Sequence, residues 1–175
     1  MQYLRGAREL EIVYRRSPAC RLVAFADSSY AENKEDRRSI SGGVLLLAGG
    51  VVSWFSRTQH CVTLSSTESE YVALANVARE VFFLGERLEF FLPTRRHGPM
   101  TVFEDNDGAI KLAKNPVCTT RTKHIDVRCH FIREKVDEKV IEVSHIPIAK
   151  QSDDGVTKNL PSEALVRHRN VLLNE

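Results

Sequence analysis

The chain has 175 residues, of which 42% are hydrophobic and 27% charged, and its formal net charge is +2. This length and composition suit one globular domain with a substantial core, and the nearly balanced charge neither requires nor excludes a polyanionic partner. No apolar stretch is long enough to span a bilayer, and the four cysteines show no CxxC spacing. Composition therefore argues against a membrane span and a disulfide framework.

Three short runs near the start of the chain predict β-strands. They cover residues 22–27, 42–48 and 51–55, which are rich in apolar side chains. Gly49 and Gly50 separate the second run from the third, and they predict a type I′ hairpin turn because both of its central positions need a positive φ. We therefore expect the second and third strands to be antiparallel neighbours.

Residues 65–92 predict one long helix. Their apolar side chains recur at helical spacing, and a proline follows the segment. Two capping boxes fit its start, one formed by Ser65 and Glu68 and the other by Thr67 and Glu70. The large aromatic residues of this helix and of the preceding strand are interpreted as core: Trp54, Phe55, Tyr71, Phe82 and Phe83.

The second half of the chain predicts further strands and helices. Residues 101–104 and 140–144 fit strands, whereas residues 107–113, 126–137 and 151–160 fit helices. The order β-β-β-α-β-α-α-β-α predicts an α/β fold with a mixed five-stranded sheet flanked by helices. The first three strands of that sheet form an antiparallel meander.

Four acidic residues, Asp27, Glu70, Asp105 and Asp154, are the candidate metal ligands. Asp27 and Asp105 close predicted strands, and Glu70 lies on the apolar stripe of the long helix, whereas Glu68 lies on a mixed face. Carboxylates that are far apart in sequence but close in space can hold hard divalent cations. Two such cations can promote cleavage of a phosphodiester.

Each of these acids also has a simpler interpretation. Glu70 could only cap the helix, and the strand-ending aspartates could only form turns. The fourth ligand is open between two neighbours. Helical spacing places Asp153 in line with Val156 and Leu160, so periodicity favours Asp153 over Asp154 for the buried face.

Basic residues gather in one stretch of the second half and in the pair Arg37 and Arg38. The stretch contains Arg121, Lys123, His124, Arg128, His130, Arg133 and Lys135. Such groups suit phosphate contacts, and a solvated helix face is the alternative. His145 follows the last predicted strand. A lone histidine is usually structural, but one beside a metal site could assist proton transfer or product release.

Five segments carry a resemblance to a known family. They are DRRSISGG (36–43), SWFSRTQHCVTLSSTESEYVAL (53–74), EDNDGAIKLAKNP (104–116), RTKHIDVRCHFIRE (121–134) and QSDDGVTKNLP (151–161). Together they resemble the ribonuclease H domain of copia-type (Pseudoviridae) LTR retrotransposon polyproteins. The resemblance implies a connecting segment from the reverse transcriptase region over residues 1–19. A ribonuclease H-like domain over 20–161 and a C-terminal tail over 162–175 follow it.

The resemblance also implies a ribonuclease H-like fold with four metal-binding carboxylates. Asp27 matches the family's aspartate at the end of the first strand, and Glu70 matches the Glu of its E-Y-x-A-L motif. Asp105 matches the Asp of its D-N-x-x-A motif. Asp154 matches the Asp of its Q-x-A-D-x-x-T-K motif, which favours it over Asp153. The implied cofactor is two Mg²⁺ ions, with Mn²⁺ able to substitute.

The chain departs from the family pattern at three of these motifs. The family's second aspartate after the first strand is Ser29 here, its Cys before the third motif's Asp is Glu104, and its Ala before the last Asp is Asp153. Extra acids beside metal ligands can shift pKa values or loosen the geometry of the site.

The function implied by the resemblance is hydrolysis of the RNA strand of RNA–DNA hybrids during reverse transcription. Arg37, Arg38, Arg121 and Lys123 would contact the nucleic acid, and His145 would join the catalytic carboxylates. The expected partners are the hybrid and the reverse transcriptase domain of the same polyprotein, with no membrane. The expected location is intracellular, in a cytoplasmic virus-like particle or the nucleus.

Two alternatives remain open. One is an inactive retrotransposon relic that only binds nucleic acid or protein. The other is a related metal nuclease on the same fold, such as a Holliday-junction or integrase-like enzyme.

Overall fold

The computed structural model describes residues 9–15, 20–32, 35–93, 98–115, 123–147, 154–158 and 160–173. Its elements are β1 (Leu22–Ser29), β2 (Ile40–Leu47), β3 (Gly50–Thr58), α2 (Ser66–Phe91), β4 (Met100–Glu104), α3 (Asp107–Lys114), α4 (Lys123–Asp137), β5 (Ile141–His145), α5 (Asp154–Thr157) and α6 (Ser162–Leu173).

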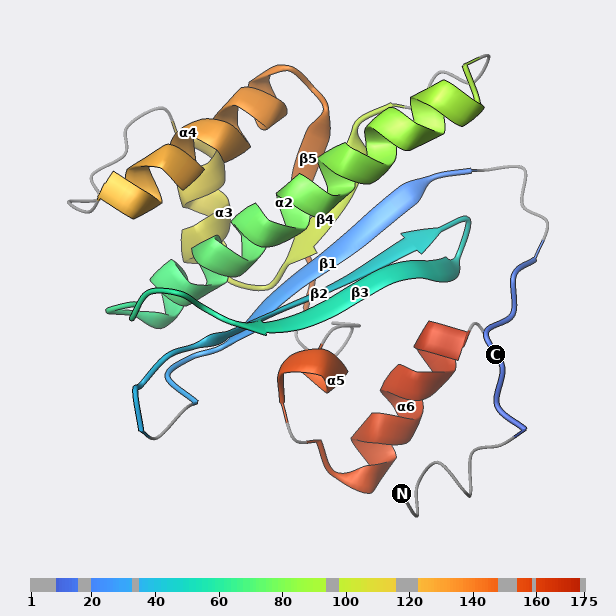
Figure 1. Cartoon of the computed structure of the whole chain (residues 1–175), viewed down its shortest axis with the longest axis horizontal. Helices are drawn as coiled ribbons and strands as arrows, with labels where there is room; N and C mark the ends of the chain where they lie inside the picture. Colours follow the sequence, from blue (N-terminus) through green and yellow to red (C-terminus); the bar gives the residue numbers. More distant parts are fainter. Residues whose placement is uncertain are drawn as a thin grey trace.

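The strands form one five-stranded sheet in the order β3-β2-β1-β4-β5 (Figure 1). The pairs β1–β2 and β2–β3 are antiparallel, whereas β1–β4 and β4–β5 are parallel. The predicted α/β class, the mixed sheet and the antiparallel meander are confirmed.

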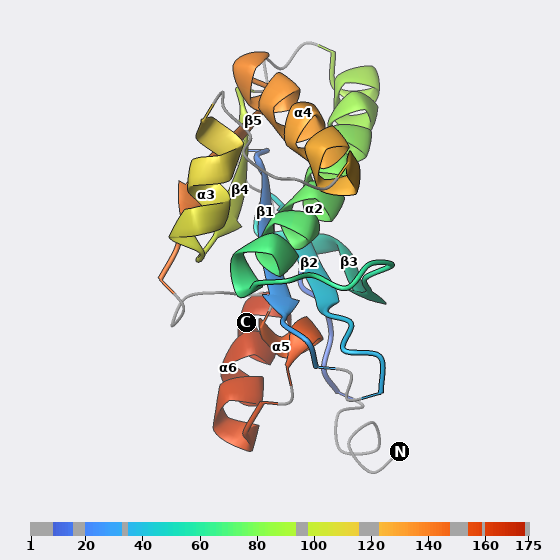
Figure 2. The ribbon, with the colours of Figure 1, turned by 90° about the vertical axis from the view of Figure 1, so that its left-hand side faces the viewer.

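Helices cover both faces of the sheet. Helices α2, α3 and α4 lie on one face, and α5 and α6 lie on the other (Figures 1 and 2). Strand β1 contributes to both layers, because Ala24 and Ala26 belong to the core under α2 while Phe25 belongs to the smaller core that includes Val156 and Leu172. Alternation along β1 therefore places successive side chains toward different helices.

Helix α2 begins and ends as its sequence predicts. The Ser65 side chain accepts a hydrogen bond from the Glu68 backbone nitrogen, and Glu68 Oε2 accepts one from the Leu64 nitrogen at 2.6 Å. The second predicted capping box is not the N-cap, because Glu70 lies on the buried face instead. Although α2 has 26 residues, no helix among the described residues is long and apolar enough to cross a bilayer.

The hairpin turn between β2 and β3 lies one residue earlier than predicted. Leu47 pairs with Gly50, so the two central residues are Ala48 and Gly49, with φ values of 53° and 91°. Gly50 is instead the first residue of β3. A Cβ at Gly50 would lie 2.4 Å from the Tyr14 ring, so the residue must be glycine for packing rather than for the turn.

The C-terminal region also differs from the prediction. Within the predicted helix of residues 151–160, the part that the structure describes is helical over α5 alone, and residues 151–153 and 159 lie outside the described residues. A further helix, α6, occupies most of the predicted tail. It contacts α5 and β3, and the Val13 backbone nitrogen donates to the carbonyl of its last residue, Leu173, at 2.9 Å.

The prediction that the large aromatic residues are core is partly wrong. Phe55 and Tyr71 are buried, but Trp54 is 66% and Phe83 48% exposed. Phe55 faces α2, and because side chains alternate along the edge strand β3, Trp54 points to the other face of the sheet. Phe83 carries the Arg87 guanidinium over its ring instead of packing inward.

Gly43 provides a test of the core under α2. A Cβ there would lie 2.5 Å from Phe55 Cε1 and 2.7 Å from Val77 Cγ2. We expect Gly43→Ala to lower the stability by about 1–3 kcal/mol through overpacking, measured by urea unfolding. Gly98→Ala is the control, because nothing lies within 4 Å of that position. Equal stability of the two variants would contradict this account of the core.

Candidate active site

The parallel pairing of β1 with β4 brings two acids together. Phe25 of β1 lies opposite Phe103 of β4, and Asp27 and Asp105 each follow two positions later. Both side chains therefore reach the same edge of the sheet, where the carboxyl ends of parallel strands commonly form binding sites. Helix α2 begins at this edge and adds Glu70 from its buried face.

The three acids form a compact cluster. One carboxylate oxygen from each of Asp27, Glu70 and Asp105 lies within 4.8 Å of the others. Asp27 is fully buried, Glu70 is 8% exposed, and Asp105 is half-buried. Glu70 Oε2 is buried and has no hydrogen-bond partner among the described residues. Hard divalent cations prefer such oxygen donors, so this cluster has the chemistry to hold a metal ion.

The cluster strongly perturbs Glu70. Burial, followed by the charges of Asp27 and Asp105, raises the pKa of Glu70 to about 8. A hydrogen bond from Ser28 and the charge of Lys158 act in the opposite direction. Glu70 is therefore largely protonated at neutral pH when no cation is present, and a bound cation would favour its ionised form.

Comparisons with known proteins relate the chain to retrotransposon polyproteins. No family model matches the chain. The chain is 36% identical over 162 residues to the retrovirus-related Pol polyprotein from transposon TNT 1-94 of Nicotiana tabacum, covering 92% of this chain and 12% of that protein. It is 34% identical over 164 residues to the corresponding polyprotein from transposon RE1 of Arabidopsis thaliana, covering 94% and 11%. The chain thus spans about a tenth of the length of these curated relatives.

A solved structure shares the fold. The crystal structure of LC11-RNase H1 in complex with RNA/DNA hybrid superposes with a TM-score of 0.54 at 17% identity, covering 83% of this chain and 99% of that one. The chain is a relative of copia-type Pol polyproteins with a ribonuclease H fold. The predicted family and fold are confirmed, and together they support a ribonuclease H-like nuclease role.

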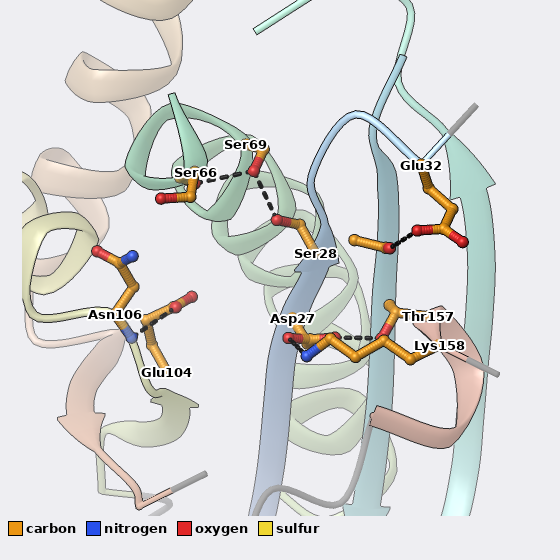
Figure 3. A network of polar contacts seen from close by, with 10 residues as sticks. Asp27, Ser28, Glu32, Ser66, Ser69, Glu104, Asn106, Thr157 and Lys158 are labelled. Atoms are coloured by element: carbon orange, nitrogen blue, oxygen red, sulfur yellow. Dashed lines mark hydrogen bonds and ion pairs between the residues drawn. The ribbon is translucent and has the colours of Figure 1, made fainter. Parts of the chain in front are cut away.

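In this ribonuclease H-like domain, Asp27 has two partners that the sequence analysis missed. Lys158 Nζ lies 2.9 Å from Asp27 Oδ1, and the Thr157 hydroxyl donates a hydrogen bond to Oδ2 (Figure 3). These residues lie 130 and 131 positions from Asp27, so no local spacing could reveal the contact. Their place in the last motif of the resemblance was the one signal available.

A buried polar network fixes the start of α2 against the sheet. Figure 3 shows the hydrogen bond between the Ser28 and Ser69 hydroxyls. Their oxygen atoms lie 2.8 Å apart. The Gln59 side-chain nitrogen donates to the Ser41 hydroxyl and the Ser69 carbonyl, both at 2.9 Å. The network joins β1, β2 and α2, and therefore holds the backbone that carries Glu70 relative to Asp27.

Glu104, one of the two acids that depart from the family pattern, contacts the turn after β4. It is fully buried, and its Oε1 accepts a hydrogen bond from the Asn106 backbone nitrogen at 3.1 Å (Figure 3). The Asn106 side chain in turn caps α3 by accepting from the Ala109 nitrogen. Together they fix the turn that contains Asp105.

The structure also describes three candidate residues outside the acidic cluster, namely His145, Arg37 and Arg38. His145 ends β5, is exposed, and pairs in register with Glu104. Arg37 and Arg38 are exposed in the loop that leaves the Asp27 end of β1, and Arg38 forms an exposed ion pair with Asp36 at 3.5 Å.

Three other candidates are described only in part or not at all. Arg121 lies outside the described residues. Lys123 begins α4 and Asp154 begins α5, but neither side chain is described. The proposed roles of these residues stay predictions, as does the choice between Asp153 and Asp154.

The raised pKa of Glu70 predicts how stability depends on pH. The folded protein binds more protons than the unfolded chain between about pH 4.5 and pH 8, so its stability in EDTA falls as pH rises through this window. Glu70→Gln carries no charge and should lack this loss, so at pH 9 it should melt roughly 5 °C or more above the parent.

Thermal melts in EDTA from pH 5 to pH 9 test this expectation. Glu89→Gln is the control, because it removes an exposed glutamate from the same helix. Parallel curves for the parent and Glu70→Gln would show that the buried cluster does not perturb Glu70.

Proposed function

We propose that the chain is a metal-dependent endonuclease that hydrolyses the RNA strand of RNA–DNA hybrids during retrotransposon reverse transcription. The observation that carries the proposal is the convergence of Asp27, Glu70 and Asp105 within 4.8 Å at one edge of a ribonuclease H fold. The homology to retrotransposon Pol polyproteins supports it.

The acidic cluster would hold the catalytic cations. Asp27, Glu70 and Asp105 would supply oxygen ligands, and Asp154 would be the fourth. Bound there, two Mg²⁺ or Mn²⁺ ions would neutralise charge on the scissile phosphate and activate the attacking water. Asp27 lies on strand β1 and Glu70 on helix α2, and Asp105 lies in the turn directly after β4. The hydrogen bond between Glu104 and Asn106 fixes that turn, which would keep the geometry of the ligands fixed.

The proposed substrate follows from the shared fold. LC11-RNase H1 was crystallised with an RNA/DNA hybrid, and by analogy this chain would recognise 2′-hydroxyls and backbone rather than base sequence. Arg37, Arg38, Arg121 and Lys123 would contact phosphates. His145, exposed at the end of β5, would assist proton transfer or product release. The reverse transcriptase domain is the proposed covalent partner, and a cytoplasmic virus-like particle or the nucleus is the proposed location.

Cleavage of a labelled hybrid tests the catalytic role of the cluster. We expect Mg²⁺-dependent cleavage of the RNA strand, no cleavage in EDTA, and a loss of more than roughly 100-fold in Asp27→Asn and Glu70→Gln, since loss of a ligand should exceed the effect of an outer-shell change. Glu89→Gln should cleave like the parent. Parent-like cleavage by Asp27→Asn would refute the proposed mechanism, and preferential cleavage of branched DNA would favour a related nuclease on this fold.

A second function is favoured by one observation. Both carboxylate oxygens of Asp27 already have partners, Thr157 and Lys158, which suits an inactive domain that only binds nucleic acid. Hybrid binding without cleavage in both Mg²⁺ and Mn²⁺ would support this alternative.

The pair Arg37 and Arg38 allows a test of hybrid binding separate from catalysis. Replacing both with alanine should weaken hybrid binding by a similar factor for every sequence and should reduce the salt slope by about one per lost phosphate contact. Fluorescence anisotropy in Ca²⁺ at several salt concentrations measures both effects. Arg87→Ala is the control, because this exposed arginine lies in the last turns of α2, away from Glu70. An unchanged salt slope in the double variant would exclude this pair from the interface.

A further inference from the structure

Helix α5 lies unusually close to the strand that neighbours Asp27. Gly42 of β2 lies directly opposite Asp27 in the sheet. A Cβ at Gly42 would come within 2.2 Å of Thr157 Cγ2 and 2.9 Å of Val156 Cγ2. The absence of a side chain at this position therefore lets Thr157 reach Asp27.

Thr157, the last residue of α5, and Lys158, which follows it, differ in their exposure. Thr157 is 6% exposed and packs against Gly42. The Lys158 side chain is 38% exposed, although its ammonium contacts a carboxylate that is fully buried. Lysine has a flexible four-carbon stem, so Lys158 can move its charge from Asp27 to solvent while Thr157 stays in place.

We propose that Lys158 is a resident cation of the acidic cluster, which neutralises Asp27 in the metal-free protein and withdraws when a divalent ion binds. Thr157 is the fixed partner that keeps the Asp27 carboxylate oriented in both states. This inference rests on the proposed metal site. Lys158 is thus a positioning residue, which competes with the metal for Asp27 instead of binding the metal.

Lys158 and a divalent ion compete for Asp27 because both are cations that would contact the same carboxylate. A buried carboxylate needs a compensating charge, and Lys158 supplies it at 2.9 Å from Oδ1. A divalent ion that uses the same oxygen would lie at ligand distance from it, so the two cations would repel each other at close range. The ion brings twice the charge to a cluster of three acids, and it therefore displaces the lysine.

Lys158→Met tests the proposal with two measurements. In EDTA the variant should melt roughly 5 °C below the parent, because Asp27 loses its counter-charge. In isothermal titration it should bind Mn²⁺ about tenfold more tightly, because the ion no longer competes with an ammonium group. Lys114→Met is the control, since it removes an exposed charge from the far end of α3.

The outcomes separate this inference from the proposed function. If Lys158→Met does not fold, Lys158→Gln provides the same comparison, because it removes the charge but keeps a hydrogen-bond donor. Melting and Mn²⁺ affinity equal to those of Lys114→Met would overturn the inference, as would weaker Mn²⁺ binding or no binding by any variant. A parent that binds Mn²⁺ but does not cleave hybrids would contradict the proposed function alone.

Discussion

The parallel register of β1 against β4 is the constraint on which the candidate site depends. Because Phe25 lies opposite Phe103, the acids that follow at the same offset reach one edge of the sheet together. A slip of one residue in β1 would turn Asp27 to the other face of the sheet. That face carries Ala24 and Ala26, which pack under α2. The packed cores on both faces hold this register, so the stability of the sheet and the geometry of the acids have the same origin.

The same convergence creates a repulsive cluster that the rest of the structure must offset. The domain does so without removing the charges: Glu70 takes up a proton at neutral pH, and Asp27 has Lys158 and Thr157 as partners. The polar network around Gln59 and Ser69 keeps the start of α2 in place despite the repulsion. A cluster held together in this way favours any occupant with higher positive charge than a lysine.

Periodicity and strand ends predicted the parts of the site that depend on local structure. Glu70 was distinguished from Glu68 by the apolar stripe of its helix, and the structure buries Glu70 accordingly. Contacts made across the whole chain were not predictable. Leu47 pairs with Gly50, so the hairpin turn lies one residue earlier than the two glycines suggested. Lys158 contacts Asp27 from 131 positions away. The periodicity that favoured Asp153 assumed a helix reaching Leu160, but α5 ends at Thr157, so that argument does not apply.

Stability and cation binding are linked in this site by its charge. A ligand that binds only the folded state stabilises it according to its affinity. Any change that leaves the three acids less well neutralised lowers the stability of the metal-free protein, and it also increases the free energy gained when a cation enters. The linkage extends to Gly42 of β2, because a side chain there would clash with Thr157, the residue that precedes Lys158. A glycine in the middle of a strand, with no charge of its own, thus leaves the space in which Thr157 contacts Asp27.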